Sequence, residues 1–206
     1  MLERGADVVI IGGGPAGLGA ALALGRAVKR VLLCDAGAPR NAAAEHMHGF
    51  VTRDGVAPAE FRRIAREQLR PYAVRTEEAR VERIEPAPGG GFALTLGDGA
   101  RVSCRRVLLT LGMIDELPDL PGLRELWGHR AFSCPYCHGW EARGERWGLL
   151  ATSEALLDHA IFLTGWTQDV VAFTDGPLEI SADLRARLAR AGVSLDTRRL
   201  RRLIAG

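Results

Sequence analysis

Apolar residues in this chain occur in short runs separated by turns and amphipathic stretches. The first run, Val8–Ile11, is followed by glycines and then by an Ala/Leu-rich segment that ends near Arg26, and a second apolar run occupies residues 31–34. β-branched residues in a continuous apolar run are typical of a strand buried on both faces of a parallel sheet. The order therefore predicts a strand–helix–strand unit at the N-terminus.

A different pattern follows the first unit. Pro58 begins an amphipathic helix through residues 58–72, and three short strands at 80–84, 92–96 and 101–104 are separated by Gly-rich turns, which predicts a β-meander. Residues 105–112, RRVLLTLG, read as another buried strand that returns to the first sheet.

The last third of the chain repeats the alternation of strands and helices. Strands are predicted at 146–151, 169–174 and 193–196, with one helix at 154–164 and another from the Ser181 cap to Gly192. The proline-bearing connector 114–122 is the best candidate boundary. We therefore expect an α/β protein with two Rossmann-like βαβ domains, 1–114 with the β-meander and a smaller one at 115–206.

The glycine turn after the first strand carries the most specific chemistry. It reads Gly12-Gly13-Gly14-Pro15-Ala16-Gly17. Gly12 permits a tight turn, Gly14 lets backbone N–H groups approach a pyrophosphate, and Gly17 allows close packing of helix on strand. The phosphates would lie at the positive helix N-terminus.

An acidic residue completes this pattern. Asp35 directly follows the second strand, where its carboxylate can accept a hydrogen bond from a ribose 2′-hydroxyl. A strand before the glycines, a helix after them and this acid are the context that distinguishes dinucleotide binding from a structural turn.

Composition excludes several classes of function. The net charge is +2 with 47% hydrophobic residues, and the basic residues are scattered, so no nucleic-acid partner is expected. No apolar run approaches the roughly 20 residues that span a bilayer, and no signal-type segment is present, so we expect a cytoplasmic chain with no membrane association.

The four cysteines fall into two groups. Cys34 and Cys104 end apolar strand patterns and are expected to be buried, unreactive thiols. Cys134 and Cys137 form a Cys-X-X-Cys pair followed by His138, which favours a redox disulfide with an adjacent proton carrier.

Two other interpretations fit the same residues. Cys134-Pro135-Tyr136-Cys137-His138 satisfies the c-type haem motif, but that attachment belongs to exported chains. A zinc site would use His129, Cys134, Cys137 and His138, yet a single pair lacks the second pair usual in structural zinc sites. Redox chemistry is preferred and no metal is expected, with zinc or purely structural cysteines as the alternatives.

A long irregular connection, 36–61, follows Asp35. Loops of this length are usually functional or disordered, and this one is dense in polar side chains. They are Arg40, Asn41, His46, His48, Arg53 and Asp54. They would lie beyond the carboxyl ends of the first strands, where open α/β sheets bind ligands.

With these motifs in hand, the chain resembles the thioredoxin-reductase-like class of FAD-dependent pyridine nucleotide-disulfide oxidoreductases over its whole length. The resemblance rests on VVIIGGGPAGLGAALALGR, DAGAPRN, HMHGFVTRDG, LPDLPG and CPYCHGWE. CPYCHG and HGF…RDG resemble the branch that contains gliotoxin- and holomycin-type dithiol oxidases.

The resemblance implies a role for each candidate residue. FAD would be held by Gly12, Gly14, Pro15, Ala16, Gly17, Asp35, Arg40, Asn41, His48, Val81 and Gly112. Cys134 and Cys137 would be the redox disulfide, with His138 at the acid/base position. The partner would be a dithiol or disulfide, either a small molecule or a thioredoxin-like protein, and the enzyme a homodimer.

Three departures from the family pattern modify these expectations. The second glycine turn is replaced by Ala151-Thr152-Ser153-Glu154-Ala155, so NAD(P)H is possible but doubtful as electron donor. LLTLG replaces the usual Ala-Thr-Gly ending near the flavin. Family members also continue beyond residue 206, so we expect the chain alone to bind FAD weakly and to turn over poorly. Oxidase chemistry with oxygen and a non-catalytic flavin-binding role are the alternatives.

Overall fold

The computed structural model describes residues 3–205. In it, three adjacent parallel strands end at the N-terminal glycine turn. The chain divides into two compact units. Unit 1 contains the residues up to Met47 and Gly55–Asp115, whereas unit 2 contains His48–Asp54 and the residues from Glu116 onward.

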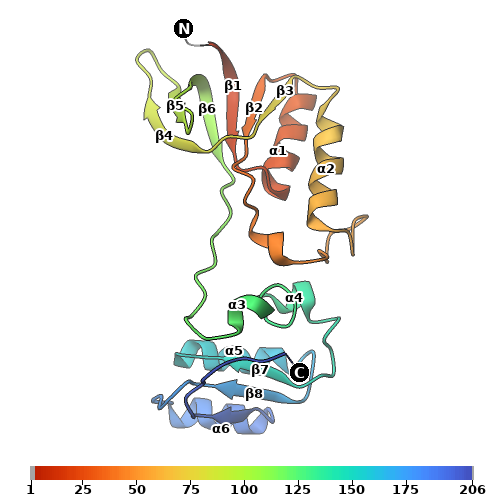
Figure 1. Cartoon of the computed structure of the whole chain (residues 1–206), viewed down its shortest axis with the longest axis vertical. Coiled ribbons are helices and arrows are strands. Elements are labelled where there is room, and N and C mark those ends of the chain that lie inside the picture. Colours follow the sequence, from red (N-terminus) through yellow and green to blue (C-terminus); the bar gives the residue numbers. More distant parts are fainter. Residues whose placement is uncertain (1–2, 206) are drawn as a thin grey trace. The chain divides into compact units, whose positions relative to one another are not determined.

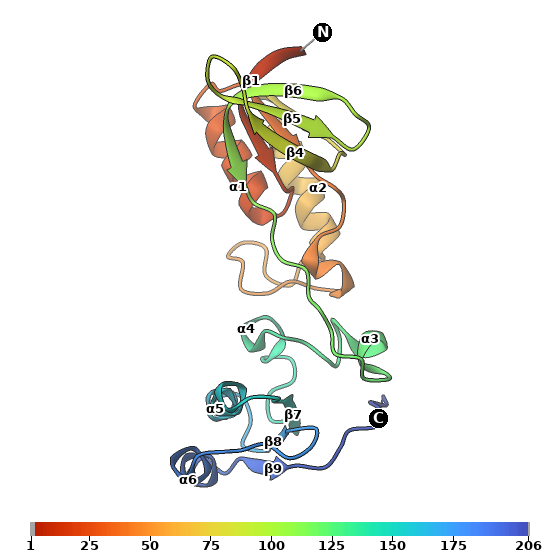
Figure 2. The same cartoon turned by 90° about the vertical axis from the view of Figure 1, so that its left-hand side faces the viewer.

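Unit 1 is one six-stranded sheet with two helices on one face (Figures 1 and 2). The strand order is β3-β2-β1-β6-β5-β4, parallel from β3 to β6 and antiparallel from β6 to β4. Its elements are β1 (Glu3–Ile11), α1 (Pro15–Arg26), β2 (Val31–Cys34), the 3₁₀-helix η1 (Arg40–Ala43), α2 (Pro58–Leu69), β3 (Val74–Glu77), β4 (Val81–Pro86), β5 (Phe92–Leu96) and β6 (Arg101–Leu109).

Alternate residues of β1 and β2 enter two different cores, because successive side chains in a strand point to opposite faces. Ile10 and Leu33 pack with Leu18 and Ala21 of α1. On the opposite face the β-meander covers a second core, formed by Val9, Ile11, Leu32, Cys34, Leu94, Leu96, Val102 and Cys104. The continuous apolar runs are thus explained by burial on both faces.

Several sequence predictions in unit 1 were wrong. Residues 101–104 and 105–112 are not two strands, because β6 is one strand, Arg101–Leu109, that pairs with β1 on both sides of a register shift. Its second half is not buried either: β5 pairs only with residues 101–104, and Leu109 is 58% exposed. The strand β3 was missed because VRTE lies at the sheet edge, where only half-buried positions are needed. Helix α2 ends at Leu69, shortly before Pro71.

Unit 2 contains a three-stranded parallel sheet in the order β7-β8-β9. Its elements are α3 (Leu123–Leu126), α4 (Pro135–His138), β7 (Trp147–Leu150), α5 (Glu154–Leu163), β8 (Val170–Phe173), α6 (Ala182–Arg190) and β9 (Ser194–Asp196). The two long helices and all three strands lie where the hydrophobic pattern predicts them. The short helices α3 and α4 were not predicted.

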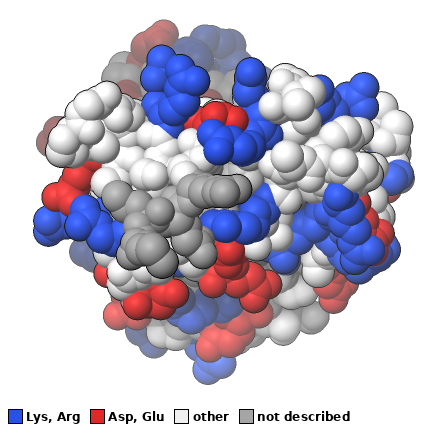
Figure 3. Space-filling model, turned by 90° about the horizontal axis from the view of Figure 1, so that it is seen from above, with Lys and Arg blue, Asp and Glu red and all other residues white. Residues whose placement is uncertain are grey.

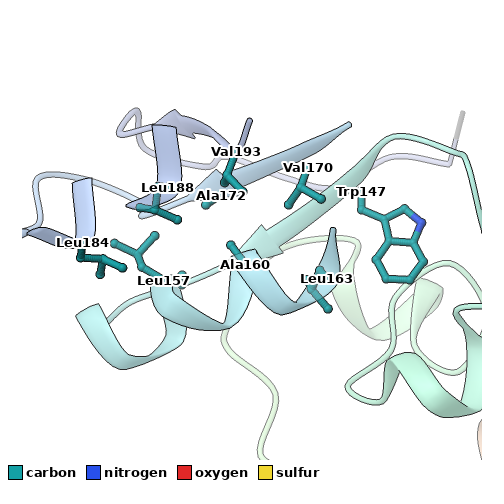
Figure 4. Packing of buried hydrophobic residues seen from close by; sticks show 10 residues of the cluster. Trp147, Leu157, Ala160, Leu163, Val170, Ala172, Leu184, Leu188 and Val193 are labelled. Carbon is teal, nitrogen blue, oxygen red and sulfur yellow. The ribbon is translucent and has the colours of Figure 1, made fainter. Parts of the chain in front are cut away.

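The core of unit 2 lies between α5, α6 and the sheet. Leu157, Ala160 and Leu163 project from α5 toward β8, and α6 contributes Leu184 and Leu188 (Figure 4). The predicted α/β class with parallel βαβ units is confirmed in both units.

We expect Leu157→Ala to lower the free energy of unfolding by about 2–5 kcal/mol, because it leaves a cavity in this core. Leu157 is completely buried, whereas its neighbour Leu156 on α5 is 44% exposed. The matched variant Leu156→Ala should change stability by less than about 1 kcal/mol. Urea unfolding of both variants tests the assignment, and equal losses would contradict it.

Candidate functional site

The glycine turn is closed by contacts that leave no room for side chains. A Cβ on Gly12 would strike the carbonyl oxygen of Thr110, and one on Gly17 would strike that of Gly12. Gly12 also has a φ of +110°, which favours glycine. The turn is pinned from both neighbouring strands, since Gly12 N donates to Cys34 O at 2.8 Å and Thr110 N donates to Ile11 O at 2.9 Å.

Gly14 differs from these two glycines. Its backbone is extended, at φ −75° and ψ −176°, and a Cβ built on it meets no atom within 4 Å. It is the N-cap of α1 and makes no side-chain cap, and Pro15 follows as the first helical residue. The helix N-terminus thus has no side-chain cap, and the space beside the Gly14 Cα is open, as an anion site at a helix N-terminus requires.

Asp35 lies beside this turn at the end of β2. Its carboxylate accepts from Arg66 Nη2 at 2.7 Å through Oδ2 and from Gly37 N at 3.1 Å through Oδ1. A carboxylate has about four acceptor sites, so both oxygens retain capacity for a ribose hydroxyl. Arg66, on α2, was not anticipated from the sequence; it holds Asp35 in position at the carboxyl end of β2.

Thr110 was also missed as a site residue. Its hydroxyl lies 2.9 Å from Ile11 O and 2.8 Å from Gly12 O, so it clamps the turn from the end of β6. The sequence signal was present in LLTLG, where a threonine follows a strand that ends beside the glycine turn. Gly112, two residues later, adopts a φ of +69°, which accounts for glycine there.

The other proposed flavin residues occupy different parts of unit 1. Arg40, at the start of η1, makes a two-pronged ion pair with Asp115 at 2.9 and 2.6 Å, and this hydrogen bonding lowers the pKa of Asp115. Asn41 follows it inside η1, where its carbonyl accepts from Ala44 N at 3.2 Å. Val81 begins β4 and packs against the second core of unit 1.

The cysteine pair lies in unit 2 at the short helix α4. Cys134 is its N-cap and Cys137 lies within it, and their sulfur atoms are 2.6 Å apart. Both residues are partly exposed, and neither forms a disulfide. A substrate sulfur can therefore reach the pair. The two sulfurs are also close enough to form a disulfide with each other.

The other two cysteines are buried free thiols, as predicted. Burial raises the pKa of Cys34 to about 11 and also raises that of Cys104. Thiols in such surroundings stay protonated and inert at neutral pH. Reactivity is thus confined to the pair at α4.

His138 ends α4 directly after Cys137. Its ring stacks on Phe132 with centroids 5.1 Å apart, and both of its nitrogens are buried without a hydrogen-bond partner. Burial lowers the pKa of the imidazole, while the negative charge of Glu141 and the backbone at Cys134 act to raise it. A neutral imidazole beside two sulfurs can accept a thiol proton.

His48 belongs to the same unit through residues 48–54. Its Nε2 lies 3.5 Å from Glu141 Oε1 and its Nδ1 lies 3.6 Å from Asp54 Oδ1. The structure therefore groups His48 with Cys134, Cys137 and His138 rather than with the residues around the glycine turn.

The second βαβ corner, between β7 and α5, is capped by its own side chains. The Ser153 hydroxyl accepts from Leu156 N at 3.4 Å, and Glu154 Oε1 accepts from Ser181 N at 2.9 Å. Hydrogen bonding from Ser181, the largest effect on the Glu154 carboxyl, lowers its pKa. A carboxylate in the first turn opposes binding of a phosphate at this helix N-terminus.

Other binding chemistries find little support in the described residues. Among residues 3–205, no three His, Cys, Asp or Glu side chains gather where they could hold a metal ion. No described helix has the length and apolar character needed to cross a bilayer. On the face shown in Figure 3, Lys and Arg lie interspersed with Asp and Glu rather than forming a patch of one sign.

Residues 6–151 match the family model described as pyridine nucleotide-disulphide oxidoreductase. A probable thioredoxin reductase of Arthroderma benhamiae is 38% identical over 180 residues, covering 84% of this chain and 45% of that protein. Thioredoxin reductase tcpT of Claviceps purpurea is 34% identical over 209 residues, covering 97% of this chain and 65% of that protein. The chain thus spans about half to two thirds of the length of these relatives.

Solved structures give the same result. The crystal structure of HlmI superposes with a TM-score of 0.93 at 42% identity, covering 99% of this chain and 65% of that one. The resemblance inferred from the glycine turn and the cysteine pair is thereby confirmed. The chain belongs to the pyridine nucleotide-disulphide oxidoreductase family and is similar within it to thioredoxin reductases.

Proposed function

We propose that the chain is the flavin- and disulfide-bearing part of a dithiol/disulfide oxidoreductase that resembles thioredoxin reductase. The observation that carries the proposal is the pair of sulfurs 2.6 Å apart on partly exposed cysteines, followed directly in the chain by His138, whose ring nitrogens are buried. In this proposal residues 1–114 bind FAD and residues 115–206 form the nucleotide-type domain with the cysteine pair. The proposed homodimer rests on likeness to the family, and the proposed cytoplasmic location rests on the sequence features described above.

The residues of unit 1 fit an FAD. Backbone N–H groups of the glycine turn would hold the pyrophosphate, since a Cβ at Gly14 would point into unfilled space. Asp35, steadied by Arg66, would accept from the adenosine ribose. Arg40, Asn41, Val81 and Gly112 of unit 1, and His48 of unit 2, are proposed as further contacts. When bound, the flavin would supply the two-electron chemistry of the reaction.

The cysteine pair would carry out the exchange with substrate. A thiolate of the reduced pair attacks a substrate disulfide, forming a mixed disulfide and releasing one substrate thiolate. The second cysteine then attacks the mixed disulfide, which releases the other substrate thiolate and leaves Cys134 and Cys137 joined. His138 would take up and return the thiol protons, and the reverse sequence oxidises a dithiol.

Two features bear on the direction of the reaction. The β7–α5 corner is capped by Ser153 and carries Glu154, which disfavours binding of a nicotinamide dinucleotide there. Oxidation of a dithiol with delivery of electrons to oxygen is therefore the second candidate function. A chain that only binds flavin is the third.

We expect Gly14→Ala to weaken FAD binding at least tenfold while the protein stays folded, because the added Cβ enters the proposed phosphate space without touching the protein. Gly19→Ala, within α1, is the matched control: its Cβ also meets no atom within 4 Å. It should leave FAD affinity unchanged and stabilise the helix by about 1 kcal/mol. Titration of FAD fluorescence measures both affinities, and equal values would count against the site.

Anaerobic spectra of the flavin-loaded protein test the reaction. We expect a dithiol to bleach the flavin of the natural sequence, and Cys137→Ser to abolish that bleaching with FAD still bound. Ser133→Ala, an exposed neighbour of the pair, is the control that should behave like the natural sequence. Bleaching by NADPH or NADH favours a reductase, and bleaching by dithiol alone favours an oxidase. Undiminished bleaching of Cys137→Ser would remove the pair from the mechanism.

A further inference from the structure

Glu141 is near two histidines of unit 2, His138 in the chain and His48 in space. It follows His138 by three residues, and the backbone continues the turn of α4 there, since Ala142 N donates to His138 O at 3.4 Å. Residues three apart on such a turn lie on the same side of it. On its other side the Glu141 carboxylate lies 3.5 Å from His48 Nε2.

The environment of His138 makes its proton affinity depend on nearby charge. Its nitrogens have no hydrogen-bond partner, and Phe132 covers one face of the ring. Stacking on an aromatic ring supplies no acceptor for an N–H group. An imidazolium formed at this position would be stabilised by a neighbouring negative charge and by the backbone at Cys134 and Gly128.

His48 competes for that charge. It is flanked by Glu141 and by Asp54, and Asp54 is itself held in place because its Oδ1 accepts from Gly49 N at 2.7 Å. A protonated His48 opposes protonation of His138, whereas Glu141 favours it. The thiols of Cys134 and Cys137 are the other titratable groups beside His138 on α4, and Arg143 lies over the Trp140 ring.

We propose that Glu141 is a positioning residue whose carboxylate, shared with His48, determines how readily His138 accepts the proton of a thiol in the cysteine pair. The proposal rests on the function proposed above. In the step concerned, a cysteine S–H bond breaks and an imidazole N–H bond forms, which leaves a thiolate beside an imidazolium near the Glu141 carboxylate. No oxidant or reductant is consumed.

The test follows the protonation of His138 directly by NMR titration of the imidazole resonances of the reduced protein. The chain has five histidines, so the His138 signal can be assigned by its loss in His138→Gln. We expect Glu141→Gln to lower the His138 titration midpoint by about half a pH unit or more. His48→Gln should raise that midpoint, because it removes the opposing positive charge.

Controls separate this role from a structural one. Glu145→Gln removes an equal charge from an exposed residue of the same unit that pairs with Arg130, and it should leave the midpoint unchanged. Glu141→Asp keeps the charge and should restore most of the natural value. The rate of iodoacetamide alkylation of the pair at pH 7 should fall about threefold in Glu141→Gln, as expected for a half-unit shift in the coupled thiol.

Two outcomes would overturn the assignment. One is a His138 titration midpoint in Glu141→Gln that equals that of the natural sequence. The other is a shift of this midpoint in the same direction in Glu141→Gln and in His48→Gln, which would indicate general loosening of the 48–54 segment. Neither measurement requires flavin or substrate. Failure here would leave the proposed exchange reaction intact, and failure of the spectral test would leave the titration of His138 unaffected.

Discussion

Close approach of backbone to backbone at the first strand–helix corner is the constraint on which unit 1 depends. Gly17 of α1 packs onto the carbonyl of Gly12, and Gly12 packs onto that of Thr110, with no space for a Cβ at either glycine. The same contacts bring the ends of β1, β2 and β6 together. An open helix N-terminus and the Asp35 carboxylate are consequently placed side by side, so the packing requirement of the fold also positions the residues of the proposed anion site.

The second corner shows what happens when that constraint is absent. The strand β7 also leads into a helix at Glu154, yet side chains stand where the first corner has glycines, and the Ser153 hydroxyl accepts from Leu156 N in the first turn of α5. The resulting hydrogen bond stabilises unit 2, since a Ser cap contributes about 1 kcal/mol. The Ser153 cap also occupies one of the backbone donors that a phosphate would need. Two units of related architecture therefore differ at equivalent turns in a few residues that bear on anion binding.

Sequence patterns predicted what depends on local chemistry. The glycine turn, the strand before it and the Cys-X-X-Cys pair are each contiguous, and the long apolar runs reveal strands buried on both faces. The edge strand β3 was not visible, because it needs no apolar alternation. The prediction of two strands in place of β6 was wrong because pairing with β1, which is distant in sequence, makes β6 one continuous strand. Arg66 contacts a residue 31 positions away in the sequence, and Thr110 contacts residues 98 and 99 positions away. No local sequence pattern shows such pairs.

The four cysteines illustrate how environment, rather than residue type, assigns chemistry. Cys34 and Cys104 are enclosed by apolar side chains, and desolvation of the thiolate holds them in the protonated form. Cys134 and Cys137 lie on a four-residue helix with partial exposure, beside an imidazole whose nitrogens are unpartnered. An imidazole without a fixed hydrogen bond is free to exchange its proton with a neighbouring thiol. Burying an imidazole without a hydrogen-bond partner costs free energy, and groups that carry such a cost are found at functional sites. This supports a role for the imidazole in proton transfer at the cysteine pair.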